Sequence, residues 1–227
     1  MIYSDFETIM TPARMSRYLA ACGSNTKKTM TLYRLNLRLS QELFTVISCY
    51  EITLRNAIDR YCQNNLGANW LRDGIQAGGI FANIGCALTR SNINDAIAKL
   101  NRSYTHNKLV AELGFGFWRY MFASNQYNAT GRTLLRIYPA KPTSTPSIQY
   151  NQGYIFNQLM ELNNLRNRIA HHEPICFQRG VPVKDTTYVR QRYVQIKQLF
   201  QWMNVDEGAL LYGLDHINTV CNQVDNL

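Results

Sequence analysis

The sequence predicts an all-α protein, because helix-type spacing of apolar residues recurs along the chain while strand-type alternation is nearly absent. The clearest stretch covers about residues 27–65, where apolar side chains recur every three or four positions. They are Leu32, Leu35, Leu39, Leu43, Val46, Ile47, Tyr50, Leu54 and Ile58. Residues typical of helix starts and ends punctuate the rest of the chain. We therefore expect roughly eight helices packed as a bundle in a single domain over residues 1–227.

The first helices are bounded by clear start and stop signals. Thr11 followed by Pro12 is typical of an N-cap with proline in the first turn, and Gly23 is expected to end the helix that begins there. The long helix over 27–65 follows, with Gly67 after its end. Ser40 is a potential interruption of this helix.

Glycine marks the middle of the chain. Residues 69–85 are glycine-rich and are expected to form a connector with some aromatic packing. Ser91 and Thr105 each open a helix, and the second runs through Gly114 and Gly116. Each glycine lowers helix stability by about 1 kcal/mol relative to alanine, so this pair either breaks the helix or allows close helix approach.

The last third of the chain contains a linker and three more helices. Residues 139–147 hold three prolines and are the best linker candidate, and the long helix that follows stops at Pro174. Asp185 is expected to cap one further helix and Asp206 a last one, which together form a C-terminal helical hairpin over 185–227.

Composition excludes several classes of protein. The chain is 46% hydrophobic and 17% charged, which excludes a disordered or collagen-like chain. The net charge of +9 favours polyanionic partners without indicating which ones, and simple solubility is the alternative interpretation of the same surplus. Six scattered cysteines without a CxxC pair are typical of reduced thiols in a cytosolic protein. Without a signal peptide or an apolar run long enough to span a bilayer, we expect a soluble, cytoplasmic protein with no membrane partner.

One segment, residues 162–174, combines two arginines, three asparagines and two histidines at the end of a helix. Asn167 and His171 are four residues apart and share a helix face, with Arg166 flanking the same edge. Pro174 would let the last turn loosen, so that Arg166 and His171 converge. A guanidinium binds phosphate oxygens, and an imidazole exchanges protons near neutral pH. This grouping therefore suits cleavage of a phosphodiester without a metal.

The same segment, LRNRIAHHEP, resembles the R-x(4–6)-H motif of the HEPN superfamily, in particular its Abi-like branch (abortive infection, AbiD/AbiF type). Two other segments are similar to parts of that family in the family's order. They are ELFTVISCYEITLRNAIDRYC, with an E-x-x-x-R-N signature, and LVAELGFGFWRYMF. The resemblance covers about residues 20–175.

The resemblance implies a HEPN-like helical bundle with metal-independent endoribonuclease activity, acting in bacterial phage defence or as the toxin of a toxin–antitoxin pair. It implies an RNA substrate and a homodimer in which two motifs face each other. An antitoxin RNA or protein is a further partner that it suggests. No cofactor and no metal are expected.

The resemblance also assigns roles to residues. Arg166 and His171 correspond to the catalytic pair, Asn167 to the polar residue beside them, and Glu51 to an acidic residue on the upstream helix. His172 also fits the permitted spacing and is the alternative catalytic histidine. We expect Asn167 to orient His171 or the phosphate.

Further basic and polar side chains are expected at the substrate. Arg55 and Asn56 match the upstream signature, and Arg168 lies within the motif itself. Arg55 and Asn56 support the site or hold the two helices together.

Other interpretations of the same residues remain open. Arg166 and His171 can form a structural pair at a helix end, and Glu51 with Arg55 can be an ordinary surface ion pair. A metal site built from His171, His172, Glu173 and Cys176 is disfavoured because adjacent histidines point in different directions on a helix. The second functional hypothesis is a non-catalytic RNA- or protein-binding module on the same scaffold. A third is a toxin that is itself the target of nucleotidyl or phosphoryl transfer.

Overall fold

The computed structural model describes residues 1–227 and is all-helical. It contains twelve α-helices and three short 3₁₀-helices, and an isolated bridge between Phe177 and Lys184 is its only β-type pairing. The all-α prediction is confirmed. The roughly eight helices expected become twelve, because some expected helices divide and several short ones were not predicted. The HEPN-like assignment stays a prediction.

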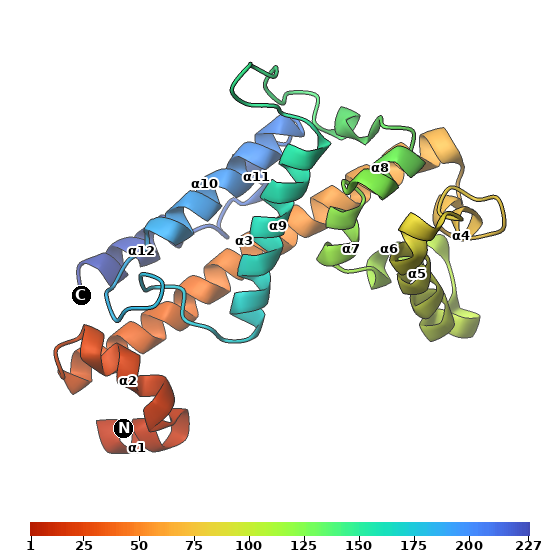
Figure 1. Ribbon diagram of the computed structural model, residues 1–227. Coiled ribbons are helices and arrows are strands. Elements are labelled where there is room, and N and C mark those ends of the chain that lie inside the picture. The colour runs from red at the N-terminus through yellow and green to blue at the C-terminus, as the bar shows by residue number, and fades with distance from the viewer. The chain divides into compact units, whose positions relative to one another are not determined.

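Figure 1 traces these helices from the N-terminus to the C-terminus. The first six α-helices are α1 (Tyr3–Met10), α2 (Pro12–Ala21), α3 (Thr26–Leu66), α4 (Trp70–Gly74), α5 (Ala87–Leu100) and α6 (His106–Glu112). The others are α7 (Phe115–Tyr120), α8 (Ser124–Ala129), α9 (Gln152–Ala170), α10 (Thr187–Trp202), α11 (Glu207–Leu210) and α12 (Ile217–Asp225). The 3₁₀-helices are Ile84–Cys86, Asn101–Ser103 and Leu134–Ile137.

The chain divides into two compact units, each built from segments that are distant in sequence. The first unit contains residues 1–48, 164–198 and 207–227. The second unit contains residues 49–163 and 199–206. The expected single domain over 1–227 stays a prediction, and the two units are described separately below.

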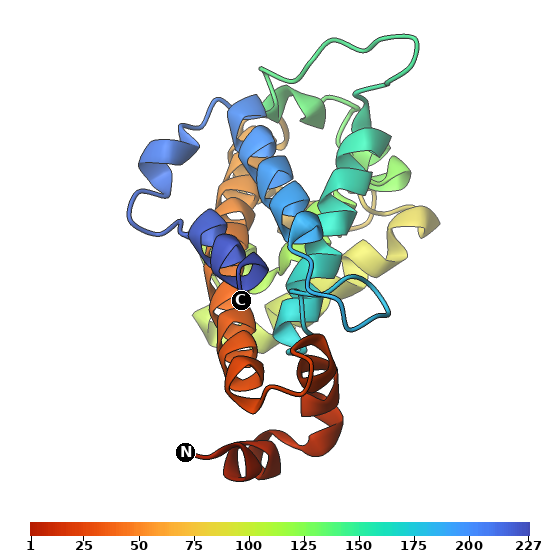
Figure 2. The ribbon, with the colours of Figure 1, turned by 90° about the vertical axis from the view of Figure 1, so that its left-hand side faces the viewer.

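An aromatic cluster holds the first unit together around α2 and α3. The ring of Tyr18 lies edge-on to the rings of Tyr33 and Phe177, with centroids 5.2 and 4.9 Å away. Phe6 of α1 adds a third edge contact at 5.5 Å from Tyr33. Figure 2 shows α1 and α2 beside the first turns of α3. Tyr33 of α3 is thus the residue on which the aromatic side chains of α1 and α2 pack.

Buried aromatic side chains also form the core of the second unit. The hydroxyls of Tyr50 and Tyr138 hydrogen-bond to each other at 2.7 Å, with both rings fully buried. All three tryptophans of the chain belong to this unit and are buried. They are Trp70, Trp118 and Trp202.

A buried carboxylate connects three helices of the second unit. Asp59 of α3 accepts hydrogen bonds from Trp70 Nε1 at 2.8 Å and Gln63 Nε2 at 2.6 Å. The Nε2 atom of His106, at the start of α6, lies 2.7 Å from the same carboxylate. A buried charge is tolerated only when such partners replace water, so Asp59 fixes α4 and α6 against α3.

The glycine pair in the expected helix after Thr105 coincides with a break. Leu113 is extended, with φ −80° and ψ 119°, and separates α6 from α7. The indole N–H of Trp118 donates to the carbonyl of Leu113 at 2.8 Å. This bond satisfies a carbonyl that has lost its helical N–H partner at the break. Of the two alternatives for this pair, a break is the one observed.

The last expected helix is also divided. The prediction of one helix from Asp206 to about Val224 is wrong, because α11 and α12 are separate. Gly213 between them has φ +74°, a left-handed conformation that a right-handed helix does not contain. By contrast, α3 runs through Ser40 without interruption, and Thr11 accepts from the N–H of Arg14 as the expected N-cap.

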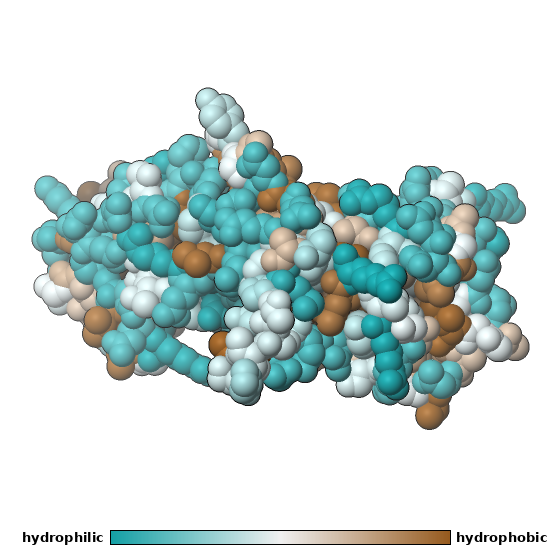
Figure 3. Space-filling view, turned by 90° about the horizontal axis from the view of Figure 1, so that it is seen from above, coloured by the Kyte–Doolittle hydropathy of each residue, from teal (hydrophilic) through white to brown (hydrophobic).

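The face of the molecule drawn in Figure 3 is mainly hydrophilic, with hydrophobic side chains in small separate groups. None of the helices combines the length and the apolar character that crossing a bilayer requires.

Unfolding stability is expected to fall at alkaline pH because of two buried thiols. All six cysteines are free, and burial raises the pKa of Cys62 and Cys176 to about 12 from the ordinary 9.0. Unfolded thiols ionise above about pH 9 while the folded ones stay neutral, so the free energy of unfolding is retained below pH 9 and falls towards pH 12. At about pH 10 each thiol should lower it by about 1.4 kcal/mol.

Urea unfolding at about pH 8 and about pH 10 checks this expectation. The variant Cys176→Ala should show a smaller pH-dependent drop than the unmodified chain. The control, Cys22→Ala, changes a half-buried thiol of the same unit. Equal drops in all three proteins would contradict the prediction.

Candidate functional site

Helix α9 ends in a tightly hydrogen-bonded turn, residues 171–174, which we call the histidine turn. The N–H of His172 donates to the carbonyl of Ile169 and that of Glu173 to the carbonyl of Arg168, both at 2.9 Å. This double pattern is the Schellman motif, which satisfies the last carbonyls of a helix. The turn is therefore closed, and the loosening that we expected from Pro174 is not observed.

His172 occupies the left-handed position of this turn, with φ +57°. Glycine or asparagine is usual there, because a Cβ atom crowds the backbone. Backbone strain of this kind occurs often at functional sites, where the side chain is needed in one place. At His172 this conformation belongs to the Schellman turn itself, since five other non-glycine residues of the chain also have positive φ.

Arg168 fastens the turn. Its Nε atom forms an ion pair with Glu173 at 3.2 Å, and another guanidinium nitrogen donates to the carbonyl of Pro174 at 3.0 Å. Its guanidinium carbon also lies 5.4 Å from the ring centroid of Tyr188. The structure thus places Arg168, expected at the substrate, in contacts that shape the turn.

The chain beyond the turn is anchored to α3. The buried side chain of Asn36 accepts a hydrogen bond from the backbone N–H of Ile175 at 2.9 Å. A buried N–H without such a partner would destabilise the fold by about 1–3 kcal/mol. Asn36 therefore fixes the point at which the chain leaves the histidine turn.

His171 and His172 are both exposed and line a pocket of about 340 Å³ in the first unit. Helix α2 supplies the opposite wall. The lining residues are Ala13, Arg14, Arg17, Tyr18, His171, His172, Glu173 and Pro174. We call this cavity the histidine-turn pocket.

Two arginines of α2 hold the pocket together. Arg14 donates to the backbone carbonyl of His172. Arg17 donates to the carbonyls of Gln178 and Val181 at 2.6 and 2.8 Å, and so ties α2 to the loop that follows the turn. Both guanidinium groups stay positively charged at any working pH. The pocket wall therefore carries two fixed positive charges opposite Glu173.

Tyr18 is a buried lining residue of the pocket. Burial, and to a smaller extent the nearby Cys176 and Tyr33, raise the pKa of its phenol well above the ordinary 10.0. The phenol therefore stays protonated at neutral pH and does not act as a base.

Arg166, the other half of the expected catalytic pair, is not among the pocket's lining residues. It is half-buried, and its guanidinium carbon lies 5.9 Å from the ring centroid of Phe44 on α3. Five helical positions correspond to about 140° around the axis, so Arg166 and His171 leave α9 in different directions. The exposed Asn167 also lies outside the lining. The structure thus brings His171 and His172 together, without Arg166.

The residues expected from the upstream signature belong to the second unit. Glu51 and Arg55 are half-buried and Asn56 is exposed. Their catalytic or substrate roles stay predictions.

Sequence reasoning missed Arg14 and Arg17. Their spacing of three along α2 places them on one helix face, which was a readable signal. No local pattern, however, indicates that this face meets a turn more than 150 residues later, where Arg14 contacts His172.

No group of three or more histidine, cysteine, aspartate or glutamate side chains is placed to hold a metal ion. Comparison of the chain with family models, with curated proteins and with solved structures finds no match.

Proposed function

We propose that the protein is a metal-independent endoribonuclease and that the histidine-turn pocket is its active site. One observation carries the proposal: two exposed histidines lie side by side in a pocket whose opposite wall carries guanidinium groups. Cleavage of RNA by its own 2′-hydroxyl needs a base, an acid and positive charge near the phosphate. The pocket contains a candidate for each.

The proposed reaction is an in-line transfer within the RNA. The 2′-oxygen forms a bond to phosphorus while the bond from phosphorus to the 5′-oxygen breaks. One of His171 and His172 takes the proton of the 2′-hydroxyl, and the other, protonated beforehand, gives a proton to the departing 5′-oxygen. The products are a 2′,3′-cyclic phosphate and a 5′-hydroxyl. Arg14 stabilises the charge that develops on the phosphate oxygens.

We further propose that the chain is an Abi-like member of the HEPN superfamily that acts in phage defence or as a toxin in the bacterial cytoplasm. The R-x(4–6)-H motif and the net charge of +9 support this. In a homodimer, Arg166 of one copy would approach RNA held at the histidine turn of the other. An antitoxin RNA or protein would restrain the activity.

Incubation of the purified protein with end-labelled RNA in excess EDTA tests the proposal. We expect fragments ending in a 2′,3′-cyclic phosphate and beginning with a 5′-hydroxyl, at the same rate with and without EDTA. Cleavage that EDTA abolishes, or products with a 5′-phosphate, would contradict the proposed chemistry.

A second candidate function is binding of RNA without cleavage. Two observations favour this function over catalysis. Arg166 lies outside the pocket, so the expected catalytic pair is not assembled there. Arg14 and Arg17 bind backbone carbonyls, so both guanidinium groups have a structural role beside any role toward RNA. In the same assay this function gives a shifted but intact RNA band that weakens steeply as salt is added.

A further inference from the structure

A cavity of about 300 Å³ lies in the second unit, between α5, α7 and α8. Its lining contains no aspartate, glutamate, lysine, arginine or histidine, whereas three carboxamide side chains and two aromatic rings line it. We call this cavity the amide pocket. Its volume lies at the lower end of the range for ligand sites, so it suits a small ligand. Nothing in the proposed ribonuclease chemistry uses it.

The polar side chains of the amide pocket keep hydrogen-bonding groups that no protein atom uses. Gln126 and Thr89 are both more than nine-tenths buried, and the amide nitrogen of Gln126 donates to the hydroxyl of Thr89 at 2.8 Å. This bond fixes the amide and leaves its carbonyl oxygen as an acceptor. The amide nitrogen of Asn125 donates to the carbonyl of Gly85 at 3.2 Å, so its carbonyl oxygen is also left. Asn92 adds a third amide, which offers both donors and an acceptor.

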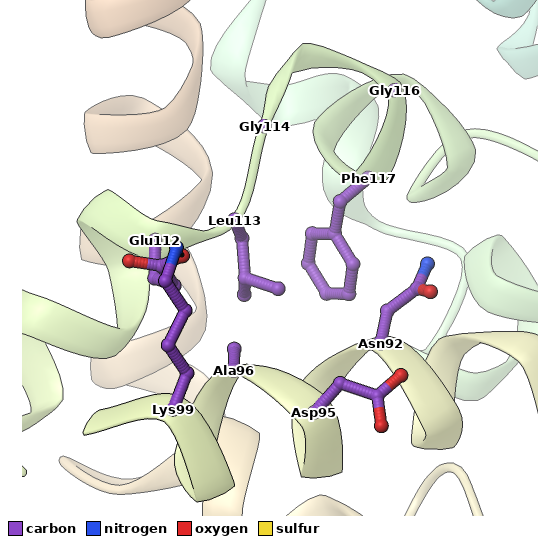
Figure 4. A pocket seen from close by; sticks show the side chains of 9 residues that line it. All are labelled: Asn92, Asp95, Ala96, Lys99, Glu112, Leu113, Gly114, Gly116 and Phe117. Atoms are coloured by element: carbon purple, nitrogen blue, oxygen red, sulfur yellow. Dashed lines mark hydrogen bonds and ion pairs between the residues drawn. The ribbon is translucent and has the colours of Figure 1, made fainter.

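Two aromatic side chains of α7 form another wall of the pocket. Phe117 and Tyr120 are three residues apart and share a helix face, and Tyr120 is 39% exposed. Figure 4 shows the ring of Phe117 pointing from α7 towards α5, where the side chain of Asn92 rises beside it. Proteins bind unpaired nucleobases with these two kinds of side chain, because the rings stack on the base and the amides hydrogen-bond to its edges.

An arginine without a carboxylate partner lies beside the pocket. The guanidinium carbon of Arg119 is 4.8 Å from the ring centroid of Tyr120 and 5.1 Å from that of Phe156. Its Nε atom is buried without a hydrogen-bond partner, and no ion pair neutralises its charge. By contrast, Arg90 donates to three backbone carbonyls and Lys99 forms an ion pair. The two rings hold the guanidinium in place by cation–π contact, so its charge is available to an anion.

The charges around the amide pocket favour an anionic group on the Arg119 side. Residues 85–126 carry five basic and two acidic side chains. Of the acidic ones, Glu112 is paired with Lys99, and Asp95 lines the adjoining pocket rather than the amide pocket. Since Asp95 repels a phosphate group and Arg119 attracts one, a nucleotide whose base enters the amide pocket has its phosphate at Arg119.

We propose that the amide pocket binds a nucleotide, with the base against Phe117 and Tyr120 and the phosphate at Arg119. An apolar ligand would leave the buried amide of Gln126 unpaired, and an uncharged ligand would leave the guanidinium without an anion. The nucleotide is either free or one unit of an RNA chain, and the chemistry at the pocket is the same for both. The proposal does not depend on the ribonuclease activity.

Isothermal titration calorimetry of the full-length protein with nucleosides and their monophosphates tests the proposal. We expect at least one monophosphate to bind, about tenfold more tightly than its nucleoside, because its phosphate forms charge-assisted hydrogen bonds to Arg119. Arg119→Gln should remove this difference and leave binding of the nucleoside unchanged. Asn92→Asp should weaken binding of the monophosphate about tenfold, because it places a negative charge in the pocket. Asn92 is exposed, so this second variant keeps the fold even if loss of the stacked guanidinium does not.

A short 2′-O-methyl RNA, titrated in parallel, distinguishes the two sources of the nucleotide. It lacks the 2′-hydroxyl that the proposed cleavage requires, so the result is independent of that activity. If it binds more than about tenfold more tightly than every monophosphate, and Arg119→Gln weakens it, the ligand is part of RNA. If a monophosphate binds within about tenfold of it, the ligand is a free nucleotide.

Arg102→Gln is the matched control, because it removes the same charge from an exposed arginine of the same unit outside the pocket. Its affinity for the monophosphate should stay within about twofold of that of the unmodified protein. Thermal unfolding verifies that each variant folds. The proposal is wrong if neither the monophosphates nor the 2′-O-methyl RNA bind, or if folded Arg119→Gln and Asn92→Asp both bind as the unmodified protein does.

Discussion

Alanine at both His171 and His172 is expected to lower the rate of RNA cleavage at least about 100-fold, since proton transfer by positioned side chains contributes a factor of about 10²–10⁴. Both side chains are exposed, so the double variant should fold normally. Initial rates on end-labelled RNA in EDTA measure the effect, and circular dichroism with thermal unfolding checks the fold. The single variants then show which histidine contributes more.

His216→Ala is the matched control for the histidine variants. His216 lies in the same unit and is half-exposed, with its Nδ1 atom 3.4 Å from Glu42, but it does not line the histidine-turn pocket. Its rate should equal that of the unmodified protein. If the double variant cleaves RNA as fast as this control, His171 and His172 are not the catalytic groups and the proposed site is wrong.

Asp59→Ala is expected to lower the free energy of unfolding by about 3–5 kcal/mol. The substitution leaves the indole N–H of Trp70 and the amide of Gln63 without their acceptor and removes the partner of His106. Trp70 is 1% exposed, so water cannot replace the lost carboxylate. Urea unfolding followed by circular dichroism at neutral pH measures the loss.

Asp73→Ala, which removes an exposed carboxylate of the same unit, controls for the loss of a negative charge. It should change the free energy of unfolding by less than about 0.5 kcal/mol. A loss at Asp59→Ala as small as this would mean that the Asp59 cluster does not hold α4 and α6 in place.

The long helices were predictable because their signals are local. The apolar spacing over 27–65 predicted α3 to within a residue at each end, whereas α9 ends at Ala170, four residues before Pro174. Propensity and spacing decide such helices because one face is buried along their whole length, as the full burial of Leu39 and Leu54 illustrates.

The shorter elements depended on contacts that local patterns do not contain. The break at Leu113 is stabilised by the indole of Trp118, and the division of the last helix depends on the left-handed Gly213. An N-terminal helix, α1, went unpredicted: four of its eight residues are apolar, but Phe6 alone is buried. Tertiary packing rather than intrinsic propensity decides elements of this length.

One side of the candidate site could be predicted from the sequence and the other side could not. The histidine turn follows from adjacent residues, so His171 and His172 could be singled out from the sequence. The α2 wall of the pocket could not, because Arg14 and Arg17 are far from the turn along the chain. The expected convergence of Arg166 with His171 assumed a loosened last turn, and the hydrogen bonds of the turn keep it closed.

The placement of the three tryptophans determines what optical measurements on this protein can detect. Because Trp70, Trp118 and Trp202 all belong to the second unit, tryptophan emission, excited apart from that of tyrosine, reports on that unit alone. Local opening of the histidine turn would leave this emission unchanged. A dye attached to the half-buried Cys22, which lies directly after α2, would supply the missing signal from the first unit.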